Sequence, residues 1–191
     1  MKLLKDRIKQ DGKVIDNRII KVDNFLNHQL DVDLFNEMGK EFKRRFSNKD
    51  ITKILTIETS GIAVACITAQ YFNVPVLFAK KQEASNLTNE VYESEVYSFT
   101  KDKLWKIRVD KRFLNGHDKV LIIDDFLALG NAAAGLIDIV KQSGAELSGI
   151  GIVIEKGFQR GRELILSKAQ VQIESLAIIE DFKDGEIIFK N

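Results

Sequence analysis

Residues 119–135 constrain the fold of this 191-residue chain more than any other stretch. They begin with a near-continuous apolar run, Val120 to Ile123, which is typical of a strand buried on both faces of a parallel sheet. Two carboxylates, Asp124 and Asp125, end that run. A small-residue loop then turns at Gly130 and leads into an Ala-rich segment that favours a helix. A buried strand, an acidic pair, a loop and a helix start therefore follow one another directly.

This junction is where an open α/β sheet binds ligands, because free amides at a helix N-terminus attract phosphate. An ionised Asp only accepts hydrogen bonds, so the acidic pair needs a different partner, and ribose hydroxyls or a metal would serve. An ordinary buried strand with a capping Asp pair is the alternative interpretation of the same residues.

The motif resembles the phosphoribosyl pyrophosphate (PRPP) binding motif of type I phosphoribosyltransferases. The common loop of that family is Ala-Thr-Gly-Gly-Thr, and the matching residues here are Ala128, Leu129, Gly130, Asn131 and Ala132. Both hydroxyls are absent, which shifts contacts with the 5′-phosphate to backbone amides, with the Asn131 side-chain amide as a substitute donor. Asp-Asp-Phe-Leu-Ala followed by Gly-Asn is similar to the branch of the family that uses xanthine.

The resemblance implies an α/β fold of the type I phosphoribosyltransferase class, with a central, mostly parallel sheet flanked by helices. It also implies one domain over residues 1–191. Within that domain, residues 1–50 and 152–191 contribute a small hood over the base, and residues 82–103 form a flexible catalytic loop.

Periodicity and turn residues predict an alternation of helices and strands after residue 53, which is the order of βαβ units. The predicted helices cover residues 2–11, 32–46, 61–72, 131–140 and 163–168. The predicted strands cover residues 14–15, 19–22, 54–57, 74–79, 97–99, 104–109, 120–123, 147–154, 171–179 and 187–189. Residues 23–29 lack a period and are expected to form a plain loop, and the polar stretch 82–94 is expected to be a long loop.

Two further segments match places where the family binds pyrophosphate. Glu58, Thr59, Ser60 and Gly61 stand between a strand and a helix, where the family has a short loop whose amides bind pyrophosphate. A simple capped turn is the alternative. Lys80 or Lys81, at the hinge of the long loop, is expected to contact the same group, and the sequence leaves open which one does.

A strand ending in Lys156, Gly157 and Phe158 suits a purine site, since a Lys ammonium can donate to a carbonyl while an aromatic ring stacks on the base. A solvated loop is the alternative. By resemblance, Ile20 borders the base, Lys156 donates to a carbonyl, and Asn27 donates to the 2-oxo group of xanthine. Trp105 is expected to pack in the protein and not to stack on a base.

The resemblance implies transfer of the 5-phosphoribosyl group from PRPP to N9 of xanthine, with pyrophosphate released. Asp124 and Asp125 would be the catalytic residues that position the ribose. Mg²⁺ would accompany PRPP and be held mainly by PRPP and water, with no direct protein ligand. The same chemistry on hypoxanthine, guanine or adenine is one alternative, and a PRPP-binding transcriptional regulator is another. The family suggests a homodimer.

The composition limits which partners and which cellular compartment we expect for this chain. Lys and Arg number 29 and Asp and Glu number 28, so the net charge of +1 gives no electrostatic footprint for nucleic acid or for an acidic membrane. No apolar run is long enough to span a bilayer, and residues 1–6 lack the apolar core of a signal peptide. We therefore expect a cytoplasmic protein without nucleic-acid or membrane partners. The single cysteine, Cys66, is expected to be a buried structural thiol.

Overall fold

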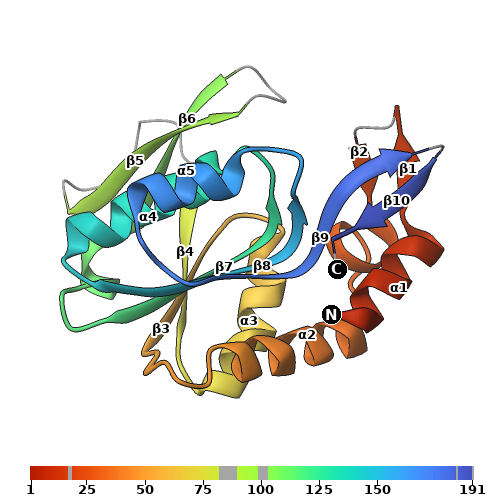
Figure 1. Cartoon of the computed structure of the whole chain (residues 1–191). Coiled ribbons are helices and arrows are strands. Elements are labelled where there is room, and N and C mark those ends of the chain that lie inside the picture. Colours follow the sequence, from red (N-terminus) through yellow and green to blue (C-terminus); the bar gives the residue numbers. More distant parts are fainter. Residues whose placement is uncertain (17–18, 82–89, 99–102, 184, 191) are drawn as a thin grey trace.

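A computed structural model of the chain describes all residues except 17, 18, 82–89, 99–102, 184 and 191. Within the described residues, the strands form an eight-stranded sheet and a separate two-stranded hairpin (Figure 1). The order across the large sheet is β10 (Glu186–Phe189), β9 (Ile173–Lys183), β8 (Glu146–Lys156), β7 (Lys119–Leu127), β3 (Lys53–Ile57), β4 (Val76–Lys81), β6 (Lys103–Asp110) and β5 (Val91–Ser98).

The centre of the sheet is parallel, and both of its edges are antiparallel. Strands β9, β8, β7, β3 and β4 pair in parallel. At one edge β10 pairs antiparallel with β9, and at the other the β5–β6 hairpin pairs antiparallel with β4. The apolar run of β7 lies between β3 and β8 and is fully buried. The predicted mostly parallel sheet is therefore confirmed.

Helices cover both faces of this sheet (Figure 1). One core lies with α4 (Asn131–Ser143) and α5 (Gly161–Lys168), and the other with α2 (Val32–Arg45) and α3 (Gly61–Phe72). The N-terminal α1 (Lys2–Asp11) contacts β9 and β10, so the two ends of the chain lie together. All five predicted helices are present, and α4 extends three residues beyond its predicted end at 140.

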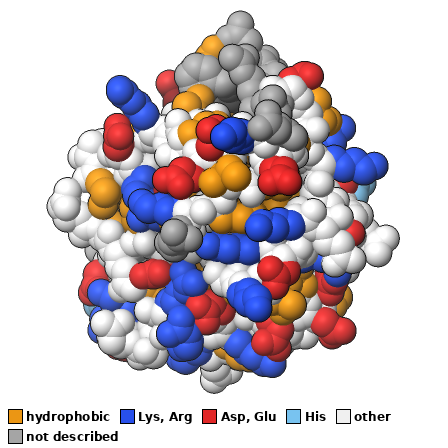
Figure 2. Space-filling model, turned by 45° about the vertical axis from the view of Figure 1, so that its right-hand side comes forward, with side chains coloured by type: hydrophobic (Ala, Val, Ile, Leu, Met, Phe, Trp, Pro, Cys, Tyr) orange, Lys and Arg blue, Asp and Glu red, His pale blue; other side chains and the backbone are white. Residues whose placement is uncertain are grey.

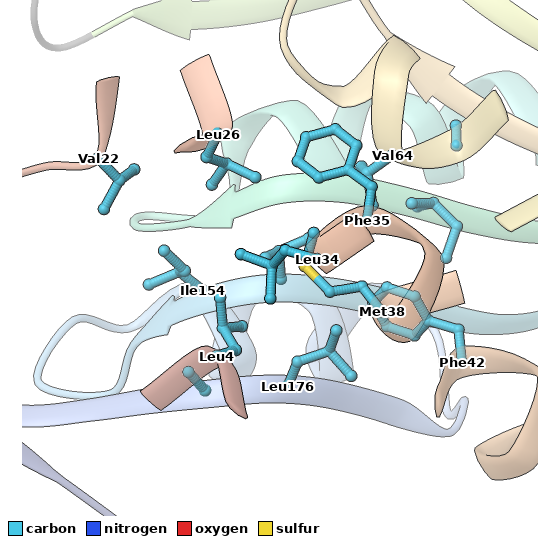
Figure 3. Packing of buried hydrophobic residues seen from close by; sticks show 14 of the residues in the cluster. Leu4, Val22, Leu26, Leu34, Phe35, Met38, Phe42, Val64, Ile154 and Leu176 are labelled. Carbon is cyan, nitrogen blue, oxygen red and sulfur yellow. The ribbon is translucent and has the colours of Figure 1, made fainter. Parts of the chain in front are cut away.

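Helix α2 shows how the sequence pattern produces the packing. Its apolar residues Leu34, Phe35, Met38 and Phe42 are buried, and in Figure 3 they gather with side chains from α1, α3, β8 and β9. Burying one such side chain stabilises the fold by about 1.5–3 kcal/mol. Asp31 caps the helix, since its Oδ1 accepts from the Leu34 amide at 3.0 Å.

The N-terminal segment departs from prediction at residues 23–29. The predicted hairpin is present as β1 (Lys13–Ile15) and β2 (Ile19–Lys21), but the expected plain loop after it contains a π-helix, Asp23–Asn27. Phe25 and Leu26 are buried in the core beside α2, and this packing compacts a segment that has no sequence period of its own.

Several strand boundaries also differ from prediction, and those of β4, β7 and β5 affect the edge of the sheet or the predicted loop. Strand β4 begins at Val76, two residues later than predicted. Strand β7 continues beyond its acidic pair to Leu127, because the ladder with β8 continues as far as the pairing of Leu127 with Glu155. Strand β5 occupies residues 91–98, so the predicted long loop cannot reach 94 or 103. The rest of that loop, residues 82–89 and 99–102, lies outside the described residues.

The prediction for Cys66 is wrong, because its side chain is exposed. A short 3-10 helix, Lys111–Phe113, follows β6. None of the helices in the described part of the chain is both long and apolar enough to cross a bilayer. On the face in Figure 2, Lys and Arg side chains are interspersed with Asp and Glu, in keeping with the net charge near zero.

Candidate active site

The carboxyl ends of β3, β4, β7 and β8 meet at one edge of the sheet, and four of the predicted motifs stand there. The Glu58–Gly61 loop follows β3, the two lysines end β4, the acidic pair and the 128–130 loop end β7, and Lys156 ends β8. This is the edge at which α/β sheets bind ligands.

The acidic pair is held inside the protein. Asp124 is 5% exposed, and its Oδ1 accepts from the Asp125 amide at 3.0 Å. Burial raises the pKa of both carboxyls, and the nearby Asp125 charge raises the pKa of Asp124 further. The charge of Lys81 acts in the opposite direction on both residues. Such a pair favours a ligand that supplies hydroxyl donors or positive charge.

Gly61 brings the start of α3 against this pair. A Cβ at Gly61 would lie 2.4 Å from Thr56 Oγ1 and 2.9 Å from Asp124 Oδ1, so only glycine allows this approach. Thr56 Oγ1 is buried and has no hydrogen-bond partner among the described residues. The loop predicted to bind pyrophosphate is therefore in contact with the carboxylates predicted to bind ribose.

Glu58 fixes the other end of that loop to β4. Its amide donates to Ala79 O at 3.1 Å, and its carboxylate accepts from the Lys81 amide. Since both groups of Glu58 are engaged within the protein, the exposed Thr59 and the half-buried Ser60 offer the more accessible contacts for a ligand, whereas Gly61 is buried.

The two candidate lysines face in different directions, because neighbouring side chains of a strand alternate. Lys81 lines the cavity beside the 128–132 loop. Lys80 lines a different groove, on the surface formed by β4 and β6, and its Nζ lies 5.8 Å from the centre of the Phe78 ring. The structure thus brings Lys81 to the candidate site and directs Lys80 away from it.

The loop after β7 turns on two glycines. Gly130 has a φ of +86°, a left-handed conformation that favours glycine, and it precedes α4 directly. A Cβ there would lie 2.8 Å from Gly161 O, and a Cβ at Gly161 would lie 2.3 Å from Ala128 O. The first amides of α4 have no intrahelical acceptors and are therefore available to bind an anion.

The Asn131 side chain has a partner within the protein, and its role as the substitute donor to a phosphate stays a prediction. Its Nδ2 donates to Tyr97 O of β5 at 3.0 Å, so the side chain ties the helix start to the hairpin. The backbone amides of the loop remain as donors to a phosphate.

A cavity of about 600 Å³ opens beside this loop. It brings together Lys81, all five predicted 5′-phosphate residues, Ala128 to Ala132, and Lys156. The β5–β6 hairpin and the turn after β8 add residues that the sequence did not indicate for the site: Val96, Tyr97, Trp105 and Gln159. Alternation along β5 is the signal that could have placed Val96 inward, but the neighbouring charged residues obscured it.

The other predicted base residues lie outside the lining of this cavity. Ile20 is buried in the N-terminal core, Asn27 is exposed at the end of the π-helix, and Phe158 packs edge-on against Phe182 at 5.6 Å between ring centres. Their contacts with a base stay predictions.

Lys156 is half-buried at the end of β8. Burial lowers the pKa of its ammonium, and no described residue forms a hydrogen bond or ion pair with that group. An unpartnered, partly desolvated cation in a cavity is well suited to bind a carbonyl or anionic edge of a ligand.

A family model described as "Phosphoribosyl transferase domain" matches residues 21–182 of the chain. The chain belongs to this phosphoribosyltransferase family. It is 65% identical to the xanthine phosphoribosyltransferase of Clostridium novyi (strain NT) over 191 residues, which is the full length of both proteins. It is 61% identical to the xanthine phosphoribosyltransferase of Clostridium tetani (strain Massachusetts / E88), again over the full length of both.

Solved structures of the family share the fold. One is APRTase from Giardia lamblia complexed with 9-deazaadenine, with a TM-score of 0.77 and 24% identity over 92% of this chain and 96% of that chain. Another is adenine phosphoribosyltransferase from Trypanosoma brucei, with a TM-score of 0.75 and 19% identity over 92% of this chain and 78% of that chain. The predicted type I phosphoribosyltransferase fold is confirmed.

Proposed function

We propose that this phosphoribosyltransferase transfers the 5-phosphoribosyl group from PRPP to N9 of xanthine, forming xanthosine 5′-monophosphate and pyrophosphate in purine salvage. The full-length identity with xanthine phosphoribosyltransferases supports this choice of base. The observation that carries the proposal is the Lys156 ammonium, which has no partner among the described residues and shares one cavity with the 128–132 loop. A base bound by Lys156 and a sugar phosphate bound by that loop would occupy the same cavity.

Different residues of the site bind different parts of PRPP. The amides of residues 128–132 bind the 5′-phosphate, and Asp124 and Asp125 accept from the ribose hydroxyls. Thr59, Ser60, Gly61 and Lys81 bind the pyrophosphate, with Glu58 anchoring their loop. In the reaction the bond from ribose C1 to pyrophosphate breaks as N9 bonds to C1, so the acidic pair also stabilises positive charge on the sugar. The site works by alignment and charge, without a nucleophilic side chain.

The base site includes a hood made by residues 1–50 and 152–191, and α1, β9 and β10 of these segments lie together near the two chain ends (Figure 1). In this hood Ile20 borders the base, Asn27 donates to the 2-oxo group, Lys156 donates to another carbonyl, and Phe158 stacks on the ring. The segment between β4 and β6 would act as the catalytic loop.

Mg²⁺ fits the chemistry of the donor set. Burial of Asp124 and Asp125 disfavours their charged forms and raises their pKa values, and a nearby cation would offset this cost. Among the described residues, no cluster of three or more His, Cys, Asp or Glu is suited to hold a metal. As the family resemblance implies, Mg²⁺ would be held mainly by PRPP and water and would supply positive charge to the pyrophosphate.

A homodimer is the proposed assembly, and an apolar groove of about 690 Å³ between β4 and β6 supports it. Phe78 and Phe113 line this groove and are 37% and 53% exposed. Exposed aromatic side chains in a groove of this size suit a surface that a second copy covers. The cytoplasmic location expected from the sequence stays a prediction.

A pyrophosphate-release assay with PRPP, Mg²⁺ and each purine base tests the proposal. We expect xanthine to give the highest kcat/KM, with release depending on both PRPP and base. Faster release with hypoxanthine, guanine or adenine would change the assigned base. PRPP binding without release for any base would support the regulator alternative.

A further inference from the structure

The last two residues of β8 serve different sides of the sheet. Lys156 lines the cavity of the candidate active site, whereas Glu155 lines a second cavity of about 690 Å³. Because neighbouring strand residues alternate, whatever fixes the direction of the Glu155 side chain also fixes the direction of Lys156.

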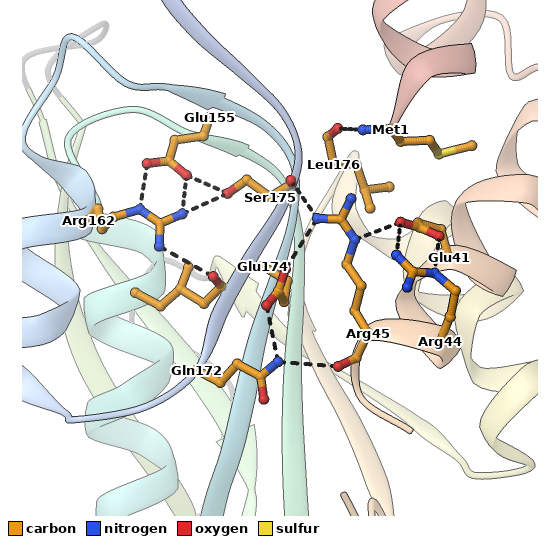
Figure 4. Close-up of polar contacts among 11 residues, drawn as sticks. Met1, Glu41, Arg44, Arg45, Glu155, Arg162, Gln172, Glu174, Ser175 and Leu176 are labelled. Carbon is orange, nitrogen blue, oxygen red and sulfur yellow. Dashed lines mark hydrogen bonds and ion pairs between the residues drawn. The ribbon is translucent and has the colours of Figure 1, made fainter. Parts of the chain in front are cut away.

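Glu155 is held by three fixed donors (Figure 4). Its carboxylate receives a two-pronged ion pair from Arg162, with Nε to Oε1 at 2.8 Å and Nη2 to Oε2 at 2.5 Å. The Ser175 hydroxyl of β9 donates to the same Oε2. Glu155 is 4% exposed, and burial alone would raise its pKa, but these donors lower the pKa overall. The carboxylate is thus fully engaged and faces away from the base.

Arg162 extends these contacts to two other elements. Its Nη1 donates to Ile173 O at 3.3 Å, and its Nη2 donates to Ser175 Oγ at 3.2 Å, so it joins α5 to β9 as well as to β8. The residue before it, Gly161, is the one that contacts Ala128 and Gly130 of the phosphate loop. The turn of residues 156–161 is therefore anchored at both ends, with Lys156 at one end and the phosphate loop at the other.

A buried ion pair contributes little net stability compared with apolar residues of the same volume. What a forked Arg–carboxylate pair does supply is fixed geometry. The Glu155–Arg162 pair lies at the start of the turn that carries Lys156. Its fixed geometry therefore suggests that the pair controls the direction of the Lys156 side chain and its distance from the phosphate loop.

We propose that Glu155, Arg162 and Ser175 are positioning residues that set the direction of Lys156 and its distance from the phosphate loop. This inference rests on the proposed contact between Lys156 and the purine. It predicts that the three residues affect base use although none of them lines the cavity that holds Lys156.

The test replaces both members of the Glu155–Arg162 pair, so that neither charge is left buried without its partner. The double variant Glu155→Gln/Arg162→Gln removes both charges, keeps the shape of the side chain at 155 and leaves a shorter polar side chain at 162. We expect its kcat/KM for xanthine to fall by roughly 10- to 100-fold, because small misplacements of a binding group cost that much. The KM for PRPP should change much less. Arg162→Lys, which keeps the charge and loses the fork, should give an intermediate loss, and Ser175→Ala should give a smaller loss in the same direction.

Lys168→Gln is the matched control. It removes an ion pair of the same helix, from Lys168 Nζ to Asp138 Oδ1 at 2.9 Å, at the end of α5 far from the turn. We expect wild-type kinetics for it. A similar loss in the control and in the pair variants would mean that any weakening of α5 lowers activity, and would overturn the inference.

A double-mutant cycle with Lys156→Met separates positioning from general damage. If the Glu155–Arg162 pair acts through Lys156, adding the pair exchange to Lys156→Met should lower the kcat/KM for xanthine little further. Equal losses with and without Lys156, or unchanged kinetics of the pair and Ser175 variants, would overturn the inference alone. Wild-type xanthine use by Lys156→Met would instead overturn the proposed base contact.

Discussion

At the scale of single residues, the acidic pair places function and stability in opposition. Burial of Asp124 and Asp125 disfavours their charged forms, as their raised pKa values indicate. The ordinary Asp pKa is 3.8, and the folded values lie above it, so the folded state binds protons more tightly than the unfolded chain does. The resulting loss of stability is absent below pH 3.8 and grows as the pH rises through the raised pKa values.

Asp125→Asn tests this opposition. It keeps volume and removes one charge, so we expect turnover to fall by about 10²-fold or more, as for other preorganised electrostatic contacts. The melting temperature at neutral pH should stay the same or rise, because a disfavoured buried charge is gone. Steady-state kinetics and thermal melts measure the two effects. Full activity in the variant would mean that the pair is structural.

Asn27→Asp tests which polar edge of the base is read. An Asn amide can donate to the 2-oxo group of xanthine, whereas a carboxylate would accept from the 2-amino group of guanine. A donor left unmatched costs about 1–3 kcal/mol. That corresponds to roughly 5- to 150-fold in relative kcat/KM. We therefore expect Asn27→Asp to have a lower kcat/KM for xanthine, and a higher ratio of kcat/KM for guanine to kcat/KM for xanthine, than wild type.

Asn24→Asp is the control for this change, since it adds the same charge at an exposed position of the same π-helix. Competition kinetics with xanthine, hypoxanthine and guanine compare the variants. The same order of preference in wild type and Asn27→Asp would show that Asn27 does not read the 2-position.

At the scale of elements, the contact between the phosphate loop and α5 is the tightest point of the site. Gly161→Ala would put a Cβ 2.3 Å from Ala128 O, and a backbone atom cannot move aside without moving the loop. We expect the KM for PRPP to rise by roughly 10-fold or more, because the loop amides lose their alignment. Gly116→Ala is the control, since a Cβ there would lie 3.6 Å from its nearest neighbour, Gly144 O. Unchanged PRPP kinetics in Gly161→Ala would separate α5 from the phosphate loop.

The sequence predicted those elements whose own residues determine them. The apolar run of β7, the capped α2 and the glycine turn before α4 each carry a local pattern, and all three are present. The same reasoning placed the acidic pair and the 128–132 loop at the carboxyl edge of the sheet, where they lie.

The elements that the sequence missed depend on distant partners. Strand β5 is polar along much of its length and is stabilised by pairing with β6, including Glu93 with Lys106 at 2.7 Å and with Arg108. The π-helix before α2 is held by the burial of Phe25 and Leu26 in a core built largely from later residues. Helix α3 is apolar on most sides, so its pattern could not show that Cys66 faces outward.

At the scale of the whole molecule, the two faces of the sheet are covered unequally. Helix α3 covers β3 and β7, but the groove between β4 and β6 leaves apolar side chains exposed. The proposed homodimer would bury this groove, and the loss of exposed apolar area would stabilise it at about 25 cal/mol per Å².

Phe78→Asp tests this assembly, because it replaces an exposed apolar side chain of the groove with a charge that a dimer would have to bury. We expect wild type to have the mass of a dimer in light scattering and the variant to shift toward the monomer. Leu104→Asp is the control, since Leu104 is 52% exposed and lies outside the groove. The carboxylates, the phosphate loop and Lys156 all lie outside the groove, so a folded monomeric variant also measures whether one subunit suffices for catalysis. A monomeric wild type, or equal dissociation in both variants, would exclude this surface as the interface.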